Sequence, residues 1–201
     1  MALRLTLISH AGTLAQKQGR FPLDESVEID WRSKANTLGQ LFSRRARFLH
    51  GPEQRAIQTA ALFSQHCELT VGLRDCDFGL WKGLRIEDID HAALCVWMSD
   101  WQVAPHGGES IRQVLQRVSE WMDSLTGIGH IIAITHPFVI RAALIRVLQC
   151  PPVVFHAVDV EPLSAVDLRF NGIWRMRAIS LLDWPQDMRM NDSFLAGVTP
   201  V

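Results

Sequence analysis

Two continuous apolar runs in the chain predict strands buried on both faces of a parallel sheet. One spans Leu3 to Ile8 and the other spans Ile131 to Thr135. The dipeptide Asn171-Gly172 separates two later β-rich runs and is typical of a hairpin turn. The remaining strands are expected at 46–50, 69–71, 164–170 and 173–179.

Between the strands, apolar residues recur at helical spacing. Helices are expected at 34–43, 53–65, 86–97, 111–125 and 137–148. Ser110 is a plausible N-cap for the fourth of these helices. Residues 15–32 are polar and irregular, which predicts a loop, and residues 185–201 are expected to form an irregular tail.

The alternation of strands and helices predicts the fold class. We expect an α/β protein, a three-layer α/β/α sandwich with a mostly parallel central sheet and a C-terminal β-hairpin. A chain of 201 residues has the length of one such domain, so residues 1–201 are expected to form a single domain.

Composition argues against several classes of partner. The formal net charge is -1, and the one short basic cluster, Arg44, Arg45 and Arg47, is typical of a solvated helix face, so no nucleic-acid partner is expected. The four cysteines form no CxxC pair, which favours reduced thiols in a cytoplasmic protein. No apolar run approaches the roughly 18 residues of a membrane span, so no membrane partner is expected.

Candidate chemistry gathers where strands are predicted to end. His10 follows the first strand, His50 ends the second with Arg55 just beyond it, and His136 follows the strand at 131–135. Ligands of such sheets bind beyond the carboxyl ends of the strands, next to helix N-termini that favour anions. Arginine donates two parallel hydrogen bonds to phosphate, and imidazole can attack phosphorus. These residues therefore point to phosphate chemistry.

Two other interpretations of these histidines stay open at this point. A histidine at a strand end is often a hydrogen-bonded structural residue. His10, His50 and His136 would form a metal site if all three met at one rim, although Arg55 nearby would repel a cation. The other histidines lack a strand-end context and are interpreted as surface or structural residues: His66, His91, His106, His130 and His156.

Four blocks of sequence resemble a known family, the histidine phosphatases of the phosphoglycerate mutase-like superfamily, in the phosphatase branch. LTLISHAGT resembles the opening strand and RHG motif, and GPEQRAIQTA is similar to the SPLxRAxQTA block. LRDCDFGLWKGL resembles LxExxFGxWEGL. PHGGES and ITHPFVIRAALIRVL resemble the PGGES loop and the VSHGGVIRALL segment. The blocks occur in the family's order between Leu3 and Leu148.

The resemblance implies roles for matching residues. His10 would be the nucleophile that forms a phosphohistidine, and Arg55 and His136 would stabilise the transferring phosphoryl group. Asp75 stands where the family often has the glutamate that acts as acid and then as base. No metal or other cofactor is implied, because protein cations supply the charge stabilisation. Four further positions are expected to contact the substrate: Ser9, Thr13, Arg20 and Glu109.

The chain also departs from the family pattern. Ser9 replaces the arginine of RHG, and loss of such a contact would cost about 2–4 kcal/mol of transition-state stabilisation. Arg20 is a candidate to reach back and substitute for it. Asp75 is one methylene shorter than glutamate, and Lys82 replaces an acid. Pro137 removes a backbone N–H that could have faced phosphate.

The leading hypothesis is therefore a phosphomonoester hydrolase that acts through a phosphohistidine on a small phosphorylated metabolite. The alternative is a catalytically weakened module that binds a phosphorylated ligand or regulates, and Ser9 motivates it. The oligomeric state is not fixed by the sequence, and a homodimer is left open. Four aromatic residues would either line an apolar substrate cleft or pack in the core: Phe21, Phe78, Trp81 and Trp97.

Overall fold

The computed structural model describes residues 2–28, 31–39, 42 and 45–177. The predicted tail at 185–201 lies outside these residues, as does the end of the last predicted strand.

The central sheet has six strands in the order β3-β2-β4-β1-β5-β6. Strands β1, β2, β3 and β4 run parallel to one another, whereas β5 pairs antiparallel with β1 and with β6. The sheet therefore confirms the predicted mostly parallel arrangement with a C-terminal hairpin. The strands are β1 (Leu3–Ser9), β2 (Arg47–His50), β3 (Cys67–Leu69), β4 (Gly129–Thr135), β5 (Ala165–Phe170) and β6 (Trp174–Met176).

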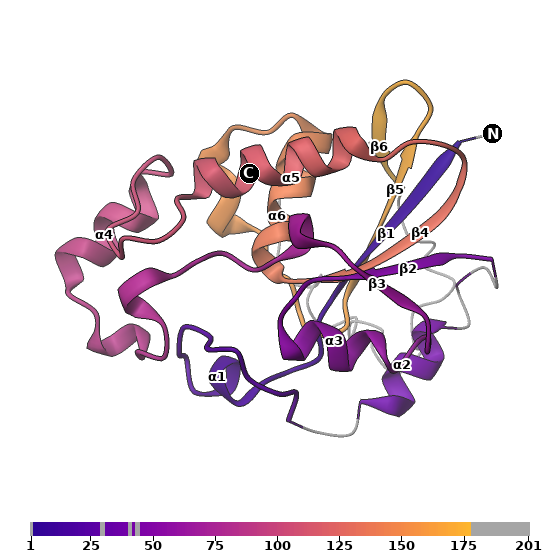
Figure 1. Cartoon of the computed structure of the whole chain (residues 1–201). Helices are drawn as coiled ribbons and strands as arrows, with labels where there is room; N and C mark the ends of the chain where they lie inside the picture. Colours follow the sequence, from indigo (N-terminus) through magenta and orange to yellow (C-terminus); the bar gives the residue numbers. More distant parts are fainter. Residues whose placement is uncertain (1, 29–30, 40–41, 43–44, 178–201) are drawn as a thin grey trace, which may run out of the picture.

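Helices cover both faces of this sheet (Figure 1). Helices α5 (Ile111–Ser124) and α6 (Pro137–Leu148) pack on one face, against the side that carries Leu5 and Leu7. Helices α2 (Arg32–Gly39) and α3 (Gln54–Ala60) pack on the other face, against Ile8. Successive strand residues point to opposite faces, so a continuous apolar run fills both interfaces. The three-layer prediction is confirmed.

Side-chain caps explain where two of the helices begin. Ser110 caps α5 as predicted, because its hydroxyl accepts a hydrogen bond from the backbone of Gln113. The prediction of one helix over 86–97 is wrong in its first part. Asp90 accepts a hydrogen bond from the backbone of Ala93 at 2.9 Å and starts helix α4 (His91–Ser99), whereas Ile86–Asp88 form a separate 3-10 turn, η3.

The predicted loop at 15–32 begins within a short helix that the apolar pattern does not predict. Helix α1 (Leu14–Lys17) begins after Thr13, whose hydroxyl accepts from the backbone of Gln16, while the Gln16 side chain accepts from the backbone of Thr13. This reciprocal pair holds a single turn that lacks a helical apolar repeat. The other 3-10 turns are η1 (Val71–Leu73), η2 (Gly79–Trp81) and η4 (Pro152–Ala157).

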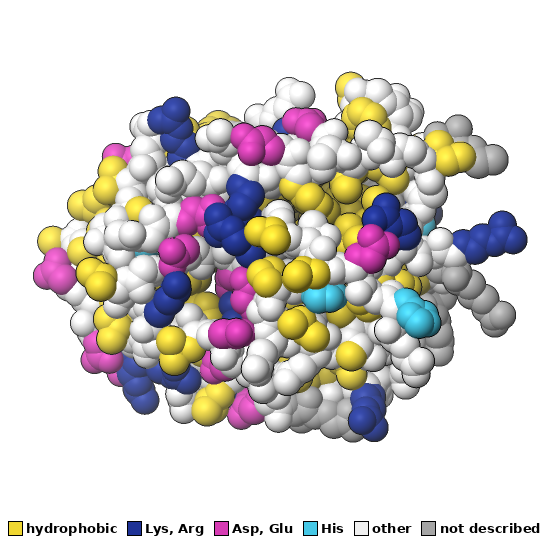
Figure 2. Space-filling view, viewed as in Figure 1, with side chains coloured by type: hydrophobic (Ala, Val, Ile, Leu, Met, Phe, Trp, Pro, Cys, Tyr) yellow, Lys and Arg dark blue, Asp and Glu magenta, His cyan; other side chains and the backbone are white. Residues whose placement is uncertain are grey.

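Charged side chains of both signs are interspersed on the face shown in Figure 2. In the short basic cluster, Arg47 forms an ion pair with Glu68 at 2.7 Å, and Arg44 lies outside the described residues. Within the described part of the chain, none of the helices is long and apolar enough to cross a membrane.

Candidate active site

The sheet topology brings two of the predicted strand-end histidines together. Strands β1 and β4 are adjacent and parallel, with Ser9 opposite Thr135, so both end at one edge. The backbone N–H of His10 donates to the carbonyl of Thr135 at 2.9 Å, which fixes the first residue after β1. The ring centroids of His10 and His136 are 5.2 Å apart.

The hydrogen bonds of His10 determine its tautomer. Nδ1 lies 2.7 Å from the carbonyl oxygen of Ala11, and a carbonyl can only accept, so Nδ1 carries the proton. Nε2 is left with its lone pair. Burial, followed by repulsion from His136, lowers the pKa of His10 to about 3. The ring is therefore neutral across the physiological range, which is the form a nucleophile needs.

Arg55 and Asp75 form a buried ion pair beside His10. Nη2 of Arg55 donates to Oδ2 of Asp75 at 2.6 Å, and Nη1 donates to the carbonyl of Leu23 at 2.8 Å. Burial alone would raise the pKa of Asp75, but attraction to His136 and Arg55 outweighs burial and lowers it. Asp75 is consequently an ionised carboxylate in the ligand-free protein.

Glu53 connects His136 to Asp75, and it is not among the site residues expected from the sequence. Nε2 of His136 donates to Oε2 of Glu53 at 2.7 Å, while the backbone N–H of Asp75 donates to Oε1 at 2.9 Å. Burial raises the pKa of Glu53, but the contact with His136 and hydrogen bonds from the backbone together lower it. The available signal was a mismatch, because Glu53 stands at the leucine position of the SPLxRAxQTA block.

Three buried polar atoms around His10 have no hydrogen-bond partner within the described residues: Oγ of Ser9, Nε of Arg55 and Nδ1 of His136. Nδ1 of His136 lies 3.4 Å from Oδ2 of Asp75, close enough for attraction but without hydrogen-bond geometry. Unsatisfied buried polar groups are costly and call for a partner. A group that presents oxygen acceptors would satisfy the Nε–H of Arg55.

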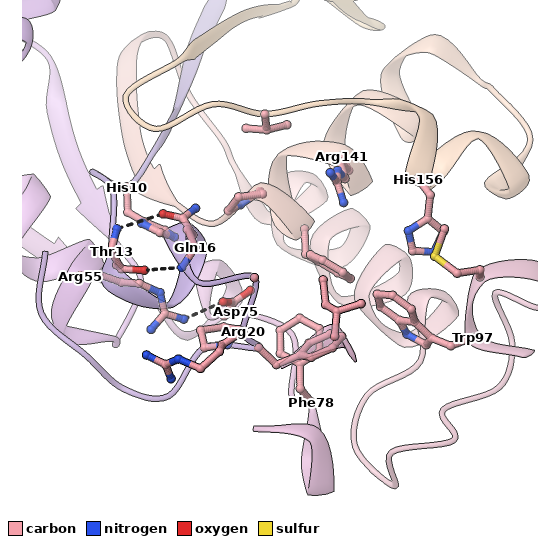
Figure 3. Close-up of a pocket in the computed structure, with 18 of the residues that line it drawn as sticks. His10, Thr13, Gln16, Arg20, Arg55, Asp75, Phe78, Trp97, Arg141 and His156 are labelled. Atoms are coloured by element: carbon pink, nitrogen blue, oxygen red, sulfur yellow. Dashed lines mark hydrogen bonds and ion pairs between the residues drawn. The ribbon is translucent and has the colours of Figure 1, made fainter. Parts of the chain in front are cut away.

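A cavity of about 630 Å³ opens beside these residues. His10, Arg55 and Asp75 line one end of it, together with Thr13 (Figure 3). Arg141, Trp97 and His156 lie toward the other end in the same view. A cavity of this size is in the usual range for sites that bind small molecules.

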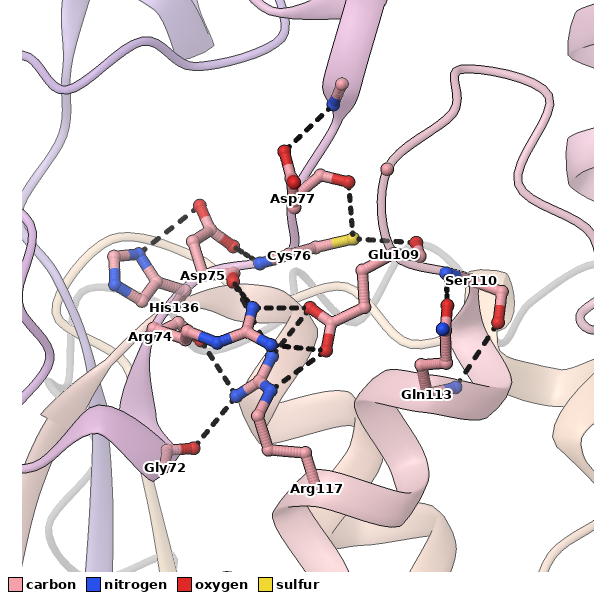
Figure 4. Close-up of polar contacts among 12 residues, drawn as sticks. Gly72, Arg74, Asp75, Cys76, Asp77, Glu109, Ser110, Gln113, Arg117 and His136 are labelled. Atoms are coloured by element: carbon pink, nitrogen blue, oxygen red, sulfur yellow. Dashed lines mark hydrogen bonds and ion pairs between the residues drawn. The ribbon is translucent and has the colours of Figure 1, made fainter.

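The other predicted substrate-binding residues fall in different places. Thr13 and Arg20 line the cavity, and Arg20 is also bonded through Nε to Gln18 at 2.8 Å. Ser9 is fully buried and adjoins His10 without lining the cavity. Glu109 does not line the cavity either, because Arg74 and Arg117 hold its carboxylate at 2.8–3.0 Å (Figure 4). Arg117 also donates to the carbonyl of Gly72, so this cluster ties α5 to the segment before Asp75.

The aromatic residues divide between lining and packing. Three of them, Phe21, Phe78 and Trp97, line the cavity and are also buried in the core, so they both line a cleft and pack in the core. Trp81 packs against Phe21 and Trp97 and does not line the cavity.

Two histidines differ from their sequence-based interpretations. His156, expected to be a surface or structural residue, lines the cavity. Nδ1 of His50 donates to the carbonyl of Gly51 at 2.7 Å, and His50 does not line the cavity. Among the residues that the structure describes, no group of histidine, cysteine and acidic side chains is arranged to hold a metal, so His10, His50 and His136 do not form the three-histidine site.

Comparison with known families assigns the chain. Residues 5–178 match the model of the histidine phosphatase superfamily (branch 1). The chain belongs to this superfamily, and the resemblance seen in the four sequence blocks is confirmed at that level.

Individual relatives are more distant. The chain is 27% identical over 195 residues to "Bifunctional protein Rv2228c" of Mycobacterium tuberculosis, with 88% of this chain and 53% of that protein covered, so it spans about half the length of this relative. A solved structure of "Mycobacterial hydrolase 1" shares 25% identity, a TM-score of 0.75 and coverage of 89% and 98% of the two chains. The mycobacterial glucosyl-3-phosphoglycerate phosphatase Rv2419c, solved with VO3, shares 25% identity, a TM-score of 0.73 and coverage of 87% and 96%.

Proposed function

We propose that this protein hydrolyses phosphomonoesters of small molecules through a phosphohistidine at His10. The observation that carries the proposal is the convergence of four family-matched residues. The neutral ring of His10 lies beside Arg55 and Asp75 at one end of the cavity, and the ring of His136 is 5.2 Å from it. Membership of the histidine phosphatase superfamily and the likeness to a mycobacterial phosphatase support it.

In the first step, Nε2 of His10 attacks phosphorus as the bond from phosphorus to the ester oxygen breaks. The proton on Nδ1 remains held by the carbonyl of Ala11, which orients the ring and stabilises the cationic phosphohistidine. Arg55 lines this end of the cavity and its Nε–H has no partner within the described residues, while Nδ1 of His136 lies 3.4 Å from Oδ2 of Asp75. Donors that are fixed before the reaction stabilise the transferring phosphoryl group without reorganisation.

The leaving alkoxide takes a proton from Asp75, which must first acquire one. Asp75 is ionised without a ligand because attraction to His136 and Arg55 outweighs burial and lowers its pKa. A bound phosphate group takes Arg55 as its own partner and adds negative charge, and both effects raise the pKa of Asp75. The proton arrives with the substrate monoanion or from solvent.

In the second step, the same carboxylate accepts a proton from water, whose oxygen attacks phosphorus. The phosphorus–Nε2 bond breaks, inorganic phosphate leaves, and His10 returns to its neutral form. Proton donation and proton removal by one carboxyl group follow from the reversal of roles between the two displacements.

The activity test uses p-nitrophenyl phosphate in the presence of EDTA. We expect the native protein to release nitrophenol and His10→Ala to lose at least about 1,000-fold in kcat, since the variant lacks the ring nitrogen that attacks phosphorus. The matched control is His66→Ala, because His66 is exposed and does not line the cavity. This variant is expected to retain full activity.

Three outcomes would contradict the proposal in different ways. Absence of turnover over a broad panel of phosphomonoesters would favour the phospho-ligand-binding or regulatory module. Activity that requires added metal would favour metal chemistry instead. Turnover that survives in His10→Ala would assign the nucleophile to another residue.

A further inference from the structure

The end of the cavity that is remote from His10 is lined mainly by aromatic side chains. Trp97, Phe138 and His156 contribute flat walls there, and the Trp97 and Phe138 rings lie 6.0 Å apart in a stacked arrangement. The Trp97 and His156 rings are 4.8 Å apart. The phosphoryl chemistry proposed above uses none of these residues.

Arg141, on α6, brings a cation into this apolar end. Nε donates to the carbonyl of Val158 at 2.7 Å, and the guanidinium lies 5.5 Å from the centre of the Phe138 ring and 5.8 Å from that of Phe155. The two terminal amino groups have no hydrogen-bond partner among the described residues, and Arg141 lines the cavity (Figure 3). The hydrogen bond from Nε to Val158 thus orients the guanidinium, and its two terminal amino groups are available to bind a ligand.

The charges around this end favour an anionic partner. Asp75 is the one carboxylate among the described residues that line the cavity, and it is bound to Arg55 at the phosphoryl end. Asp159 attracts Arg141 from outside the lining without an ion pair or hydrogen bond between them. Burial and then repulsion from Arg141 lower the pKa of His156, so this neighbour is a neutral hydrogen-bonding group.

We propose that the remote end of the cavity is a subsite for a second acidic group, which Arg141 binds, and that the aromatic walls hold a flat apolar body between this group and the phosphate. The inference rests on the proposed function, because it takes the phosphoryl group to be bound at His10. It names the substrate class as phosphomonoesters that carry an aromatic or similarly flat body and a carboxylate or second phosphoryl group.

Non-hydrolysable probes test this subsite by binding, independently of turnover. The probes are benzylphosphonates and biphenylmethylphosphonates whose para substituent is a carboxylate on a spacer of no, one or two methylenes. Each is matched by its neutral carboxamide, and a further member carries a second phosphonate. Binding is measured by titration calorimetry with the native protein, Arg141→Gln, Arg141→Lys and Arg146→Gln. Arg146 is the control because it lies on the same helix and pairs with Asp123 at the surface.

With the best spacer, we expect the carboxylate probe to bind about 10–100-fold more tightly than its carboxamide, the range of a charge-assisted bidentate contact. The preference should fall to about 2-fold in Arg141→Gln, persist in part in Arg141→Lys and be unchanged in Arg146→Gln. The ratio compares two probes on one protein preparation, so partial misfolding of a variant does not affect it. The second-phosphonate probe shows which acid the subsite prefers.

The inference is overturned if no probe shows an acid preference above about 3-fold, or if Arg141→Gln retains the preference, since either result removes the predicted charge-assisted contact. Turnover of p-nitrophenyl phosphate, measured on the same preparation, reports on the proposed function separately. Turnover without an acid preference contradicts the subsite alone. An acid preference without turnover supports the subsite and contradicts the proposed catalysis.

Discussion

His136 has a carboxylate on each side of its ring, and this arrangement defines the site at the scale of single residues. Glu53 accepts from Nε2 at 2.7 Å, and Asp75 lies 3.4 Å from Nδ1. The chain lacks the arginine of RHG, where Ser9 stands, and has an acid where the SPLxRAxQTA block has leucine. Glu53 fixes the ring so that Nδ1 is directed toward Asp75, which lines the cavity.

Replacement of Glu53 tests its effect on His136. Glu53→Gln removes the charge that holds Nε2, and loss of a charge-assisted hydrogen bond of about 1.5–3 kcal/mol corresponds to about 10–100-fold in kcat/KM. The loss should fall mainly on kcat, and the ¹⁵N shifts of the His136 ring should move. The matched control is Glu68→Gln, which breaks an exposed ion pair with Arg47. Unchanged kcat/KM and ring shifts in Glu53→Gln would show that Glu53 has no positioning role.

The buried His10 makes stability depend on pH in a defined direction. Its pKa is lowered by burial to about 3 in the folded protein, against 6.5 when exposed. Between these values the unfolded chain binds a proton that the folded protein does not, so stability is lost as pH falls through this range. A neutral His10 also means that protonation of this residue does not limit the reaction at pH 5.

The pH effect is measured by urea unfolding at pH 6.5 and pH 5. The native protein should lose about 1.5 kcal/mol over this interval through His10 alone, and His10→Gln should lose correspondingly less. The exposed His66 provides His66→Gln as the control, in which the native loss is expected. Equal losses in the native protein and in His10→Gln would show that the folded His10 titrates as an exposed histidine does.

At the scale of elements, local patterns predict the strands and their following helices well. The two continuous apolar runs form β1 and β4, and α6 begins at Pro137, as expected from the sequence. The apolar pattern does not predict element boundaries that depend on a single side-chain cap. The capping box of Thr13 starts α1, and the Asp90 cap separates η3 from α4. These contacts carry no apolar repeat, so periodicity does not detect them.

Backbone hydrogen bonds join the loop around Asp77 to the loop around Gly108, and the lack of a side chain at Gly108 permits this close approach. The N–H of Glu109 donates to the carbonyl of Asp77 at 2.7 Å, and a Cβ on Gly108 would lie 2.0 Å from that carbonyl oxygen. Leu80 donates to the carbonyl of His106 at 2.9 Å from the other side. The loop that follows Asp75 and contributes Phe78 to the cavity is positioned by this contact.

Gly108→Ala should therefore destabilise the fold by about 2–3 kcal/mol, because backbone atoms must move to admit the methyl group. Gly39→Ala is the control, since its Cβ would meet Phe63 at an ordinary 3.8 Å and should be neutral or stabilising in α2. Urea unfolding gives both values. A Gly108→Ala variant as stable as the native protein would show that the two loops separate at little cost.

At the scale of the whole molecule, the strand order explains how much of the site the sequence could predict. Placing β1 beside β4 brings His10 to His136, and the rule of ligand sites at strand ends anticipates this. The partners of Glu53 and Glu109 could not be predicted, because they depend on contacts across 83 and 35 positions of the chain. Glu109, expected to contact the substrate, instead neutralises Arg74 and Arg117.

The central claim is that the phosphoryl group passes through His10. The most direct test mixes the protein with a ³²P-labelled phosphomonoester, stops the reaction in alkali within one turnover, and maps the labelled peptide by mass spectrometry. We predict one phosphoryl group on His10, stable to alkali, labile to acid and absent from His10→Ala. Label on another residue, or steady turnover with no label on His10 while His10→Ala stays active, would contradict the account.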